Sequence, residues 1–393
     1  MQFEIQSSTL LPILNTMSRL IGSKPLIPIL ENVKFYEKDG QYLITATSGD
    51  QEAVLTAVLP LENVVDFHPF LVPVCQLCQM VKAAEGSIFP LTFKTGTHNG
   101  GKSGDKTLGI DYGEGEYQIF YLDVDEYPVT KVGELSAPIT VPSSVVSAMT
   151  TAKGFTSSDD LRPIMQCVYL DITTEGVMRV VGCDQRTMFV TNIRDIQSTS
   201  NVGILFKANI ISTLSNLLPK DARLNIQTGA KFVVIDIVAP TEDGGSSVLY
   251  RIESRNVEGR YPPYNRIIPN TSESILIDSR TFLKAVERAA VCANDATKQL
   301  RFDIVPGQSF ITVKAQDVEK SRNSRTSLEV KDGCVNVHSA TSVGFRYDFL
   351  TRCIGAINTK DIAFNFVNAT KAFLLNATDG NTTVLIMPQQ LLD

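Results

Sequence analysis

Two short patterns in this sequence could carry chemistry, and the first is a phosphate-binding loop. Residues 96–103 read Gly-Thr-His-Asn-Gly-Gly-Lys-Ser and satisfy the pattern G-x-x-x-x-G-K-[ST]. That motif binds phosphate because a helix follows it and directs backbone amides at the anion. Here the next residues, GDKTLGIDYGEGEYQIFYL, are glycine-rich and strand-like. We therefore interpret 96–103 as a hairpin loop, and a phosphate-loop nucleotide hydrolase remains an alternative function.

The second pattern is Cys75-x-x-Cys78, which could indicate a redox or zinc site. No second cysteine pair stands at a metal-ligand spacing, and on a helix we expect both sulfurs to face the core. None of the 3 histidines has a suitably spaced partner. Cys183 lacks a nearby base that would make it a nucleophile. The sequence therefore predicts no catalytic residue, no metal and no cofactor, and a protein that is not an enzyme.

The composition is that of a globular protein with several packed cores. The chain has 393 residues, and 36 basic against 42 acidic side chains give a net charge of -6. The first residues lack the basic and apolar segments of a signal peptide, and no apolar run approaches the roughly 18 residues of a membrane span. We expect a cytoplasmic protein that does not contact membranes, whose 7 cysteines are reduced and mostly buried.

A repeat organises the elements around these residues. Helix-like segments with apolar side chains at i, i+3, i+4 and i+7 recur about every 65 to 70 residues. Between them lie alternating, β-branched segments with Asp-Gly or Gly-Gly turns, which are typical of antiparallel hairpins. The predicted helix starts are Ser8, Val74, Ser143, Lys207, Ser279 and Arg346.

A longer repeat groups these units in pairs. Glu-Tyr-Pro at 126–128 is echoed by Gly-Arg-Tyr-Pro at 259–262, and Met387-Pro388 closes a third copy. We predict an α+β protein of three similar domains, each built from two β-α-β-β-β-like units. The predicted domains are 1–133, 134–269 and 270–393.

Basic residues concentrate in the helical segments, although the whole chain is acidic. Arg280, Lys284 and Arg288 follow an i, i+4, i+8 spacing and project from one helical stripe. A positive surface of this kind contacts phosphates without reading bases, since it lacks a recognition helix and aromatic stacking platforms. An all-sheet scaffold that ignores nucleic acid remains the second alternative.

Four motifs together resemble the bacterial replicative sliding clamp family, the β subunit of DNA polymerase III, over essentially the full length. The first two are Ser23–Leu30, read SKPLIPIL, and Leu161–Met165, read LRPIM and followed by Cys183-Asp184-Gln185-Arg186. The others are Glu258–Tyr264, read EGRYPPY, and Ile386-Met387-Pro388. All four stand in order at the family's separations.

The resemblance implies a non-catalytic processivity factor. In this family two subunits form a head-to-tail ring around duplex DNA, with helices lining the pore and sheets outside. It implies that Lys24 and Lys207 approach phosphates, and the helical charges add Lys153, Arg280, Lys284 and Arg288. The subunit interface would pair Tyr117 and Ile119 with Val291 and Cys292, which would cover unpaired strand edges. The expected partners are double-stranded DNA, the polymerase III catalytic subunit, a clamp loader and other clamp-binding-motif proteins.

The resemblance further implies a peptide-binding pocket between the second and third domains. Apolar surfaces would receive a partner's aliphatic and aromatic anchors, with Gln and Arg at the rim and adaptable, exposed methionines. The pocket residues by motif position are Met165, Cys183, Gln185, Arg186, Thr187, Met188, Pro262, Ile267, Leu385, Met387, Pro388, Gln389 and Gln390.

The sequence departs from the family pattern inside this pocket. The family usually has Thr-Asp-Gly-His-Arg-Leu at 183–188 and ends in Met-Pro-Met-Arg-Leu, whereas this chain has Cys-Asp-Gln-Arg-Thr-Met and ends MPQQLLD. We therefore predict that the pocket is retained and that its peptide preference is altered.

Overall fold

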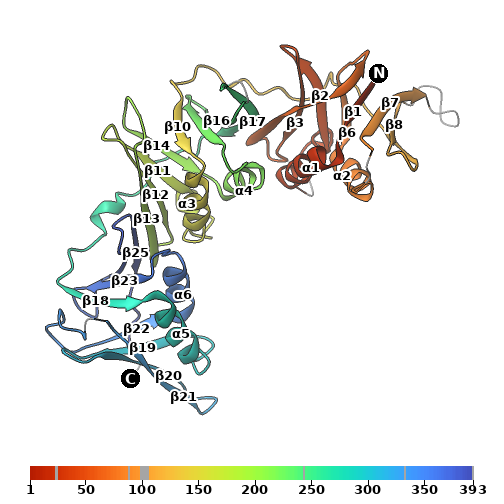
Figure 1. Cartoon of the computed structure of the whole chain (residues 1–393). Helices are drawn as coiled ribbons and strands as arrows, with labels where there is room; N and C mark the ends of the chain where they lie inside the picture. The colour runs from red at the N-terminus through yellow and green to blue at the C-terminus, as the bar shows by residue number, and fades with distance from the viewer. Residues whose placement is uncertain (23–24, 87–88, 98–105, 242–243, 332, 392–393) are drawn as a thin grey trace. The chain divides into compact units, whose positions relative to one another are not determined.

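A computed structural model describes residues 1–22, 25–86, 89–97, 106–241, 244–331 and 333–391, so Lys24 lies outside the described residues. The chain divides into two compact units (Figure 1). Unit 1 comprises 1–146 and 209–256, and unit 2 comprises 147–208 and 257–393. The division into domains at 133 and 269 stays a prediction, because each unit takes part of the segment 134–269.

Six α-helices occur in the described ranges, and each begins within one residue of its predicted start. They are α1 (Ser7–Ile21), α2 (Val74–Ala83), α3 (Ser144–Lys153), α4 (Ala208–Leu217), α5 (Ser279–Ala290) and α6 (Tyr347–Gly355). Short 3-10 helices are η1 (Pro28–Glu31), η2 (Pro163–Gln166) and η3 (Tyr264–Arg266). None of the helices in these ranges is long and apolar enough to cross a membrane.

Unit 1 contains two antiparallel sheets. The first has the order β5-β1-β7-β8-β9, with β1 (Gln2–Ile5), β5 (Glu62–Val65), β7 (Leu91–Thr97), β8 (Lys106–Asp111) and β9 (Glu116–Phe120). The second has the order β10-β15-β16-β17-β4-β3-β2-β6, with β2 (Asn32–Lys38), β3 (Gln41–Thr47), β4 (Ala53–Leu59), β6 (Phe70–Pro73), β10 (Ile139–Pro142), β15 (Arg223–Thr228), β16 (Phe232–Pro240) and β17 (Ser246–Arg255).

Unit 2 also contains two antiparallel sheets. The larger has the order β14-β11-β12-β13-β25-β24-β23-β18, with β11 (Val168–Ile172), β12 (Val177–Cys183), β13 (Thr187–Arg194), β14 (Val202–Phe206), β18 (Glu273–Asp278), β23 (Asp361–Phe366), β24 (Phe373–Ala377) and β25 (Thr382–Ile386). The smaller has the order β21-β20-β19-β22, with β19 (Gln299–Ile304), β20 (Phe310–Asp317), β21 (Arg322–Glu329) and β22 (Thr341–Arg346).

Both eight-stranded sheets continue across a predicted domain boundary. In unit 1, β17 pairs with β4 through Tyr250 opposite Ala57, and in unit 2, β13 pairs with β25 through Thr187 opposite Ile386. Backbone hydrogen bonds thus join the segment 134–269 to the chain on either side. A ladder of this kind leaves no strand edge open where two repeats meet.

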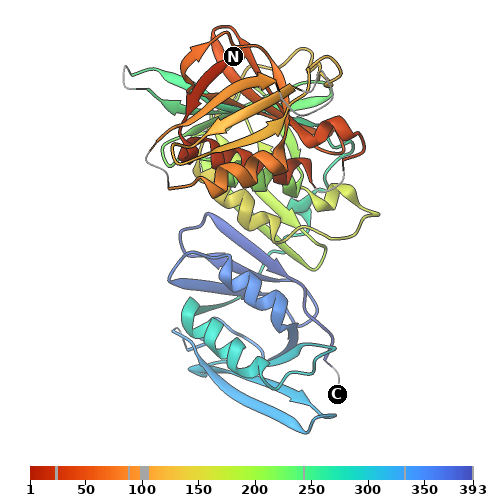
Figure 2. The same cartoon turned by 90° about the vertical axis from the view of Figure 1, so that its right-hand side faces the viewer.

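Helix α5 shows how the helices cover the sheets. Its buried side chains, Phe282, Ala285, Val286 and Ala289, lie on one face, and α5 packs beside α6 (Figure 2). The helix begins where the Asp278 carboxylate accepts a hydrogen bond from the Thr281 amide at 2.9 Å, because a side-chain oxygen at this position satisfies an otherwise unpaired donor. The opposite face remains open to solvent.

The repeated Tyr-Pro motifs occupy similar surroundings in the two units. Tyr127 is buried against Leu30 of η1 and Leu71 of β6, and its hydroxyl accepts a hydrogen bond from the Thr47 amide at 3.1 Å. Tyr261 is buried in a cluster that includes Met165, the third residue of η2. The repeat read in the sequence therefore corresponds to a repeated packing of tyrosine on a 3-10 turn.

The prediction for the cysteine pair is wrong in one respect. The buried side of α2 is formed by Val74, Leu77 and Val81, so Cys75 and Cys78 lie one position further round the helix. Cys75 is exposed, and the Cys78 thiol donates to the Asn15 side chain at 3.3 Å.

Four of the 7 cysteines in the chain are buried, and all 7 are free. No group of His, Cys, Asp and Glu in the described ranges could hold a metal.

Candidate functional site

The candidate site lies on an apolar cluster at one face of the large sheet of unit 2. Side chains alternate along a strand, so residues 181 and 183 of β12 share this face, as do 188 and 190 of β13. The linker before β18 crosses the same face and adds two tyrosines. The buried members are Met165, Val181, Cys183, Met188, Val190, Tyr261, Tyr264, Ala372, Leu374 and Leu385. The candidate site therefore lies directly on packed apolar side chains.

A tight turn between β12 and β13 forms one wall of the candidate site. Gln185 has a φ of 72°, a left-handed conformation. The Asp184 carboxylate accepts hydrogen bonds from the amides of Arg186 at 3.0 Å and Thr187 at 2.6 Å. The Arg186 carbonyl in turn accepts a hydrogen bond from the Met387 amide at 2.8 Å. The turn is thus held by its own aspartate and joined to the end of β25.

The structure brings most of the predicted pocket residues together, but not with the expected exposure. Ile267 and Met387 are 48% and 40% exposed, and Gln185 and Arg186 are also exposed. Residues half-buried around them are Pro262, Pro388 and Gln389. The side chains that could touch a ligand directly are therefore a small apolar set with polar neighbours.

Two of the three methionines assigned to the pocket are packed in the core. Met165 and Met188 are buried in the apolar cluster, because their positions face inward from η2 and β13, and only Met387 is exposed. Cys183, Thr187 and Leu385 are buried as well. Burial raises the pKa of the Cys183 thiol, which keeps it protonated and apolar near neutral pH.

The C-terminal residues of the predicted pocket contact the smaller sheet of unit 2. The Gln389 amide donates to the Gly344 carbonyl at 2.8 Å, and the Gln390 carbonyl accepts from the Gln299 side chain at 2.7 Å. Both glutamines are therefore tied to β19 and β22 by backbone groups. The Gln389 side chain also donates to the Thr297 carbonyl at 3.4 Å, so the exposed Gln390 side chain is the better candidate for a ligand's rim contact.

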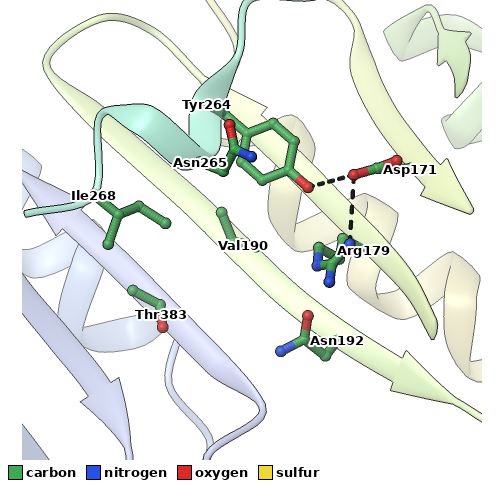
Figure 3. Close-up of a pocket in the computed structure, with 8 residues that line it drawn as sticks. All are labelled: Asp171, Arg179, Val190, Asn192, Tyr264, Asn265, Ile268 and Thr383. Carbon is green, nitrogen blue, oxygen red and sulfur yellow. Dashed lines mark hydrogen bonds and ion pairs between the residues drawn. The ribbon is translucent and has the colours of Figure 1, made fainter. Parts of the chain in front are cut away.

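A cavity of about 280 Å³ lies beside the apolar cluster and was not predicted (Figure 3). The Tyr264 hydroxyl donates to the Asp171 carboxylate at 2.6 Å, and the Arg179 guanidinium lies 3.6 Å from the same carboxylate. Burial and this carboxylate raise the pKa of Tyr264 well above its ordinary value. The remaining lining residues are Val190, Asn192, Asn265, Ile268 and Thr383. Side chains two positions apart on a strand lie on the same face of the sheet. Counting from Val181 and Val190 would therefore have placed Arg179 and Asn192 on this face.

The predicted DNA-contacting residues of unit 2 lie on helices or at their ends. Arg280, Lys284 and Arg288 are exposed on α5, opposite its buried face. Lys153 ends α3 and Lys207 precedes α4, and both are half-buried. Some other cations of the helical segments form ion pairs within the protein.

Two basic residues at α6 do not add to the expected positive surface, because each is paired with a carboxylate. Arg346 is bound by Asp348 at 2.8 Å, and Arg352 is bound by Asp184 at 2.6 Å. Spacing along one helix cannot reveal such partners. These two residues therefore serve ion pairs within unit 2 and contribute little open positive charge.

The residues predicted for the subunit interface lie at edges. Tyr117 and Ile119 belong to β9, which is the last strand of its sheet, although the Ile119 side chain is buried. Val291 follows α5 and is 71% exposed, while Cys292 is half-buried. Phe120, the last residue of β9, and Leu122 beyond it expose further apolar surface. Each unit thus offers an unpaired edge or an exposed apolar residue.

This arrangement of sheets and six helices defines a sliding-clamp fold. The crystal structures of the sliding clamps of Pseudomonas aeruginosa and Bacillus subtilis superpose with TM-scores of 0.84 and 0.82, at 19% and 17% identity, each over 100% of both chains. The curated beta sliding clamps of Haemophilus influenzae and Pseudomonas aeruginosa are 23% and 20% identical to this chain over 100% of both sequences.

Family profiles agree with these likenesses. Residues 1–131 match the N-terminal domain of the DNA polymerase III beta subunit, and residues 265–390 match its C-terminal domain. The chain belongs to the bacterial DNA polymerase III beta sliding clamp family. Its function is that of a DNA sliding clamp, and neither a nucleotide hydrolase nor a scaffold unrelated to nucleic acid is supported. The first described segment after the phosphate-loop pattern is β8, a strand, as predicted.

Proposed function

We propose that two copies of this chain assemble head to tail into a closed ring that encircles duplex DNA and has no catalytic activity of its own. The supporting observation is the match to beta sliding clamps over the whole length of both chains. A closed ring retains DNA by threading, so weak and transient phosphate contacts are sufficient. The three predicted domains would each contribute two of the six helices to the pore.

The exposed stripe on α5 is the proposed DNA-facing surface of unit 2. Arg280, Lys284 and Arg288 stand one helical turn apart and can each approach a phosphate. Lys153 and Lys207 are proposed to add further contacts, as is Lys24. Flexible cations of this kind neutralise phosphates whatever the base sequence, which permits sliding.

The proposed subunit interface pairs strand β9 of one subunit with the region of Val291 and Cys292 in the other. Strand β9 has a free edge, and strand addition would satisfy its open backbone groups. The adjacent Phe120, 56% exposed, would become buried. A clamp loader would open one such interface to admit DNA.

The proposed partner site is the pocket of unit 2 described above. Its exposed Ile267 and Met387 would receive apolar anchors of a short peptide, and Gln185 and Arg186 would bind the peptide backbone. Proposed partners are the polymerase III catalytic subunit, the clamp loader and other proteins with a clamp-binding motif. The proposed location is the cytoplasm. Related structures include a Pseudomonas aeruginosa clamp bound to griselimycin and a C. crescentus clamp with polyethylene glycol at its β-motif tethering region.

Retention on circular and linear DNA tests the ring directly. Protein loaded onto nicked circular DNA by a matching clamp loader should remain bound in salt that abolishes electrostatic binding, and it should leave once the circle is cut. Equal loss from circles and linear molecules would contradict threading. Salt-sensitive retention on both would indicate ordinary electrostatic binding.

A matched pair of triple variants tests the stripe. Changing Arg280, Lys284 and Arg288 to alanine should lower loading several-fold, because three phosphate contacts are lost. The control changes Arg194, Lys231 and Lys371, three exposed cations on strands and loops, to alanine. Both variants lose the same charge, so equal loading by the two would show that net charge matters and the stripe does not.

A further inference from the structure

A guanidinium on α6 reaches across to the turn that forms one wall of the candidate pocket. The same terminal nitrogen of Arg352 donates to the Asp184 carboxylate at 2.6 Å and to the Thr187 hydroxyl at 2.5 Å. Asp184 is 14% exposed and Arg352 is 31% exposed, so the pair is largely shielded from water. These bonds join two segments that are 168 residues apart in the chain.

The same guanidinium also contacts the end of α3. Its other terminal nitrogen donates to the Gly154 carbonyl at 2.8 Å, and its central carbon lies 4.9 Å from the ring centre of Phe155. The ring centre of Phe349, three residues earlier on α6, lies 5.2 Å from the same carbon. A planar guanidinium suits this position because it forms directed hydrogen bonds at its edge and stacks on aromatic rings.

The turn held in this way carries the exposed polar side chains of the pocket. Asp184 already binds the amides of Arg186 and Thr187, and the Arg186 carbonyl binds the Met387 amide. A movement of Asp184 would therefore be transmitted to both sides of the pocket. Without the guanidinium, this nearly buried carboxylate would lose its ion-pair partner and move toward water.

We propose that Arg352 is a positioning residue that holds the turn 184–187, and with it Met387, in the geometry that accepts a partner peptide. The proposal rests on the proposed partner site and adds a residue that does not itself line it. A site whose supporting contacts are lost retains its residues but no longer holds them in place, so affinity falls without loss of the fold.

Peptide affinity and local amide exchange test the proposal together. The probe is a fluorescein-labelled synthetic peptide covering the clamp-binding segment of a bacterial polymerase III catalytic subunit. Arg352→Met, which keeps the long side chain and removes its donors, should weaken binding about tenfold. Arg352→Lys keeps the charge without the forked geometry and should be intermediate. In Arg352→Met the amides of Arg186 and Thr187 should exchange faster, while the β11–β12 ladder should be unchanged.

Arg251→Met is the matched control. Arg251 forms a comparable two-bond pair with Asp236, at 2.7 and 2.9 Å, but it belongs to unit 1, whereas the pocket residues belong to unit 2. This variant should lose thermal stability to a similar extent and bind the peptide as the parent does. An equal loss of affinity in the control would show a general effect of destabilisation and would overturn the proposal.

The outcomes also separate this proposal from the function on which it rests. Unchanged peptide affinity in Arg352→Met, with the parent binding normally, would overturn the positioning role alone. A parent protein that binds no peptide would contradict the proposed partner site. In that case the amide exchange still tests the positioning role. Equal exchange rates at Arg186 and Thr187 in Arg352→Met and in the parent would show that Arg352 does not hold the turn.

Discussion

Asp348 is the carboxylate on which two cations of unit 2 converge. Arg346 donates to it at 2.8 Å and Lys298 at 3.2 Å. Burial opposes its ionisation, but these hydrogen bonds outweigh burial and lower the pKa of Asp348 to about 2. Asp303 is lowered to about 2 in the same way, against burial, by Lys314 and Arg301. Ionised Asp348 and Asp303 therefore both stabilise the folded protein, and this stabilisation is lost in acid.

The Asp348 network predicts a pH-dependent contribution to the free energy of unfolding. The folded-state pKa lies below the ordinary 3.8, so the stabilisation is fully present above about pH 4 and is lost as the pH falls through about 2. Asp348→Asn should lower the free energy of unfolding by about 1 kcal/mol at pH 7, since the site is partly exposed to solvent. Urea titrations at pH 7, 4 and 2.5 should show this difference shrinking with acidity. A difference that is constant over this range would contradict the assignment.

Gly182 is a second residue at which a small change has a large predicted effect. A Cβ there would lie 2.1 Å from the Ala152 carbonyl oxygen, because β12 passes close to the backbone of α3. Gly182→Ala should therefore destabilise the protein by about 2 kcal/mol, measured as a lower urea midpoint. Gly355→Ala is the control, since no atom lies within 4 Å of its added Cβ. The control should be neutral or slightly stabilising in its helix. Equal effects of the two would exclude the close approach as the cause.

Strand β9 is the element on which assembly is predicted to depend. It is an edge strand of its sheet, and the Tyr121 amide just after it donates to the Lys106 carbonyl of β8. In an antiparallel ladder every second amide of an edge strand points away from its neighbour, so alternate amides of β9 face outward. Phe120, the last residue of β9, is exposed and gives this edge an apolar side chain. Such an edge favours strand addition by a second copy.

A single substitution on this edge tests the predicted assembly. If the chain dimerises as proposed, Phe120→Asp should convert the dimer to monomer at micromolar concentration, because a charged carboxylate would be buried in the interface. Sedimentation velocity at several concentrations measures this change. Val129→Asp is the control, since Val129 is exposed outside any strand and should leave the dimer intact. A dimer that persists in Phe120→Asp would place the interface elsewhere.

On the scale of the whole molecule, the two eight-stranded sheets make the segment 134–269 dependent on its neighbours. Its strand β17 pairs with β4, and its strand β13 pairs with β25. The predicted domain is thus a unit of repetition in the sequence, while its sheets are completed by other parts of the chain. Excision would expose two long strand edges at once.

Expression of the fragment 134–269 by itself tests this dependence. The fragment should aggregate or unfold at a lower urea concentration than the full chain, because two ladders of backbone hydrogen bonds lose their partners. Circular dichroism during urea titration and amide exchange in β13 and β17 would measure the loss. A monomeric fragment with native protection in both strands would contradict it.

Much of the architecture was predictable from local patterns. The six helix starts follow from apolar spacing, and the antiparallel hairpins from alternation and turn residues, because both depend on neighbours within a few positions. The family resemblance assigned the pocket residues to the region between the second and third predicted domains, and Met165, Cys183 and Leu385 do meet in one cluster. Local patterns did not reveal which of these side chains face inward.

The sequence by itself determined the repeat, the alternation of helices and strands and the family resemblance, since these are periodic or contiguous in the chain. Only the tertiary structure decided that Arg352 binds Asp184, that Met188 is buried and that β13 continues into β25. These features depend on contacts between distant segments. The direction of a long side chain is set by the partner that folding brings within reach, and no local spacing encodes that partner.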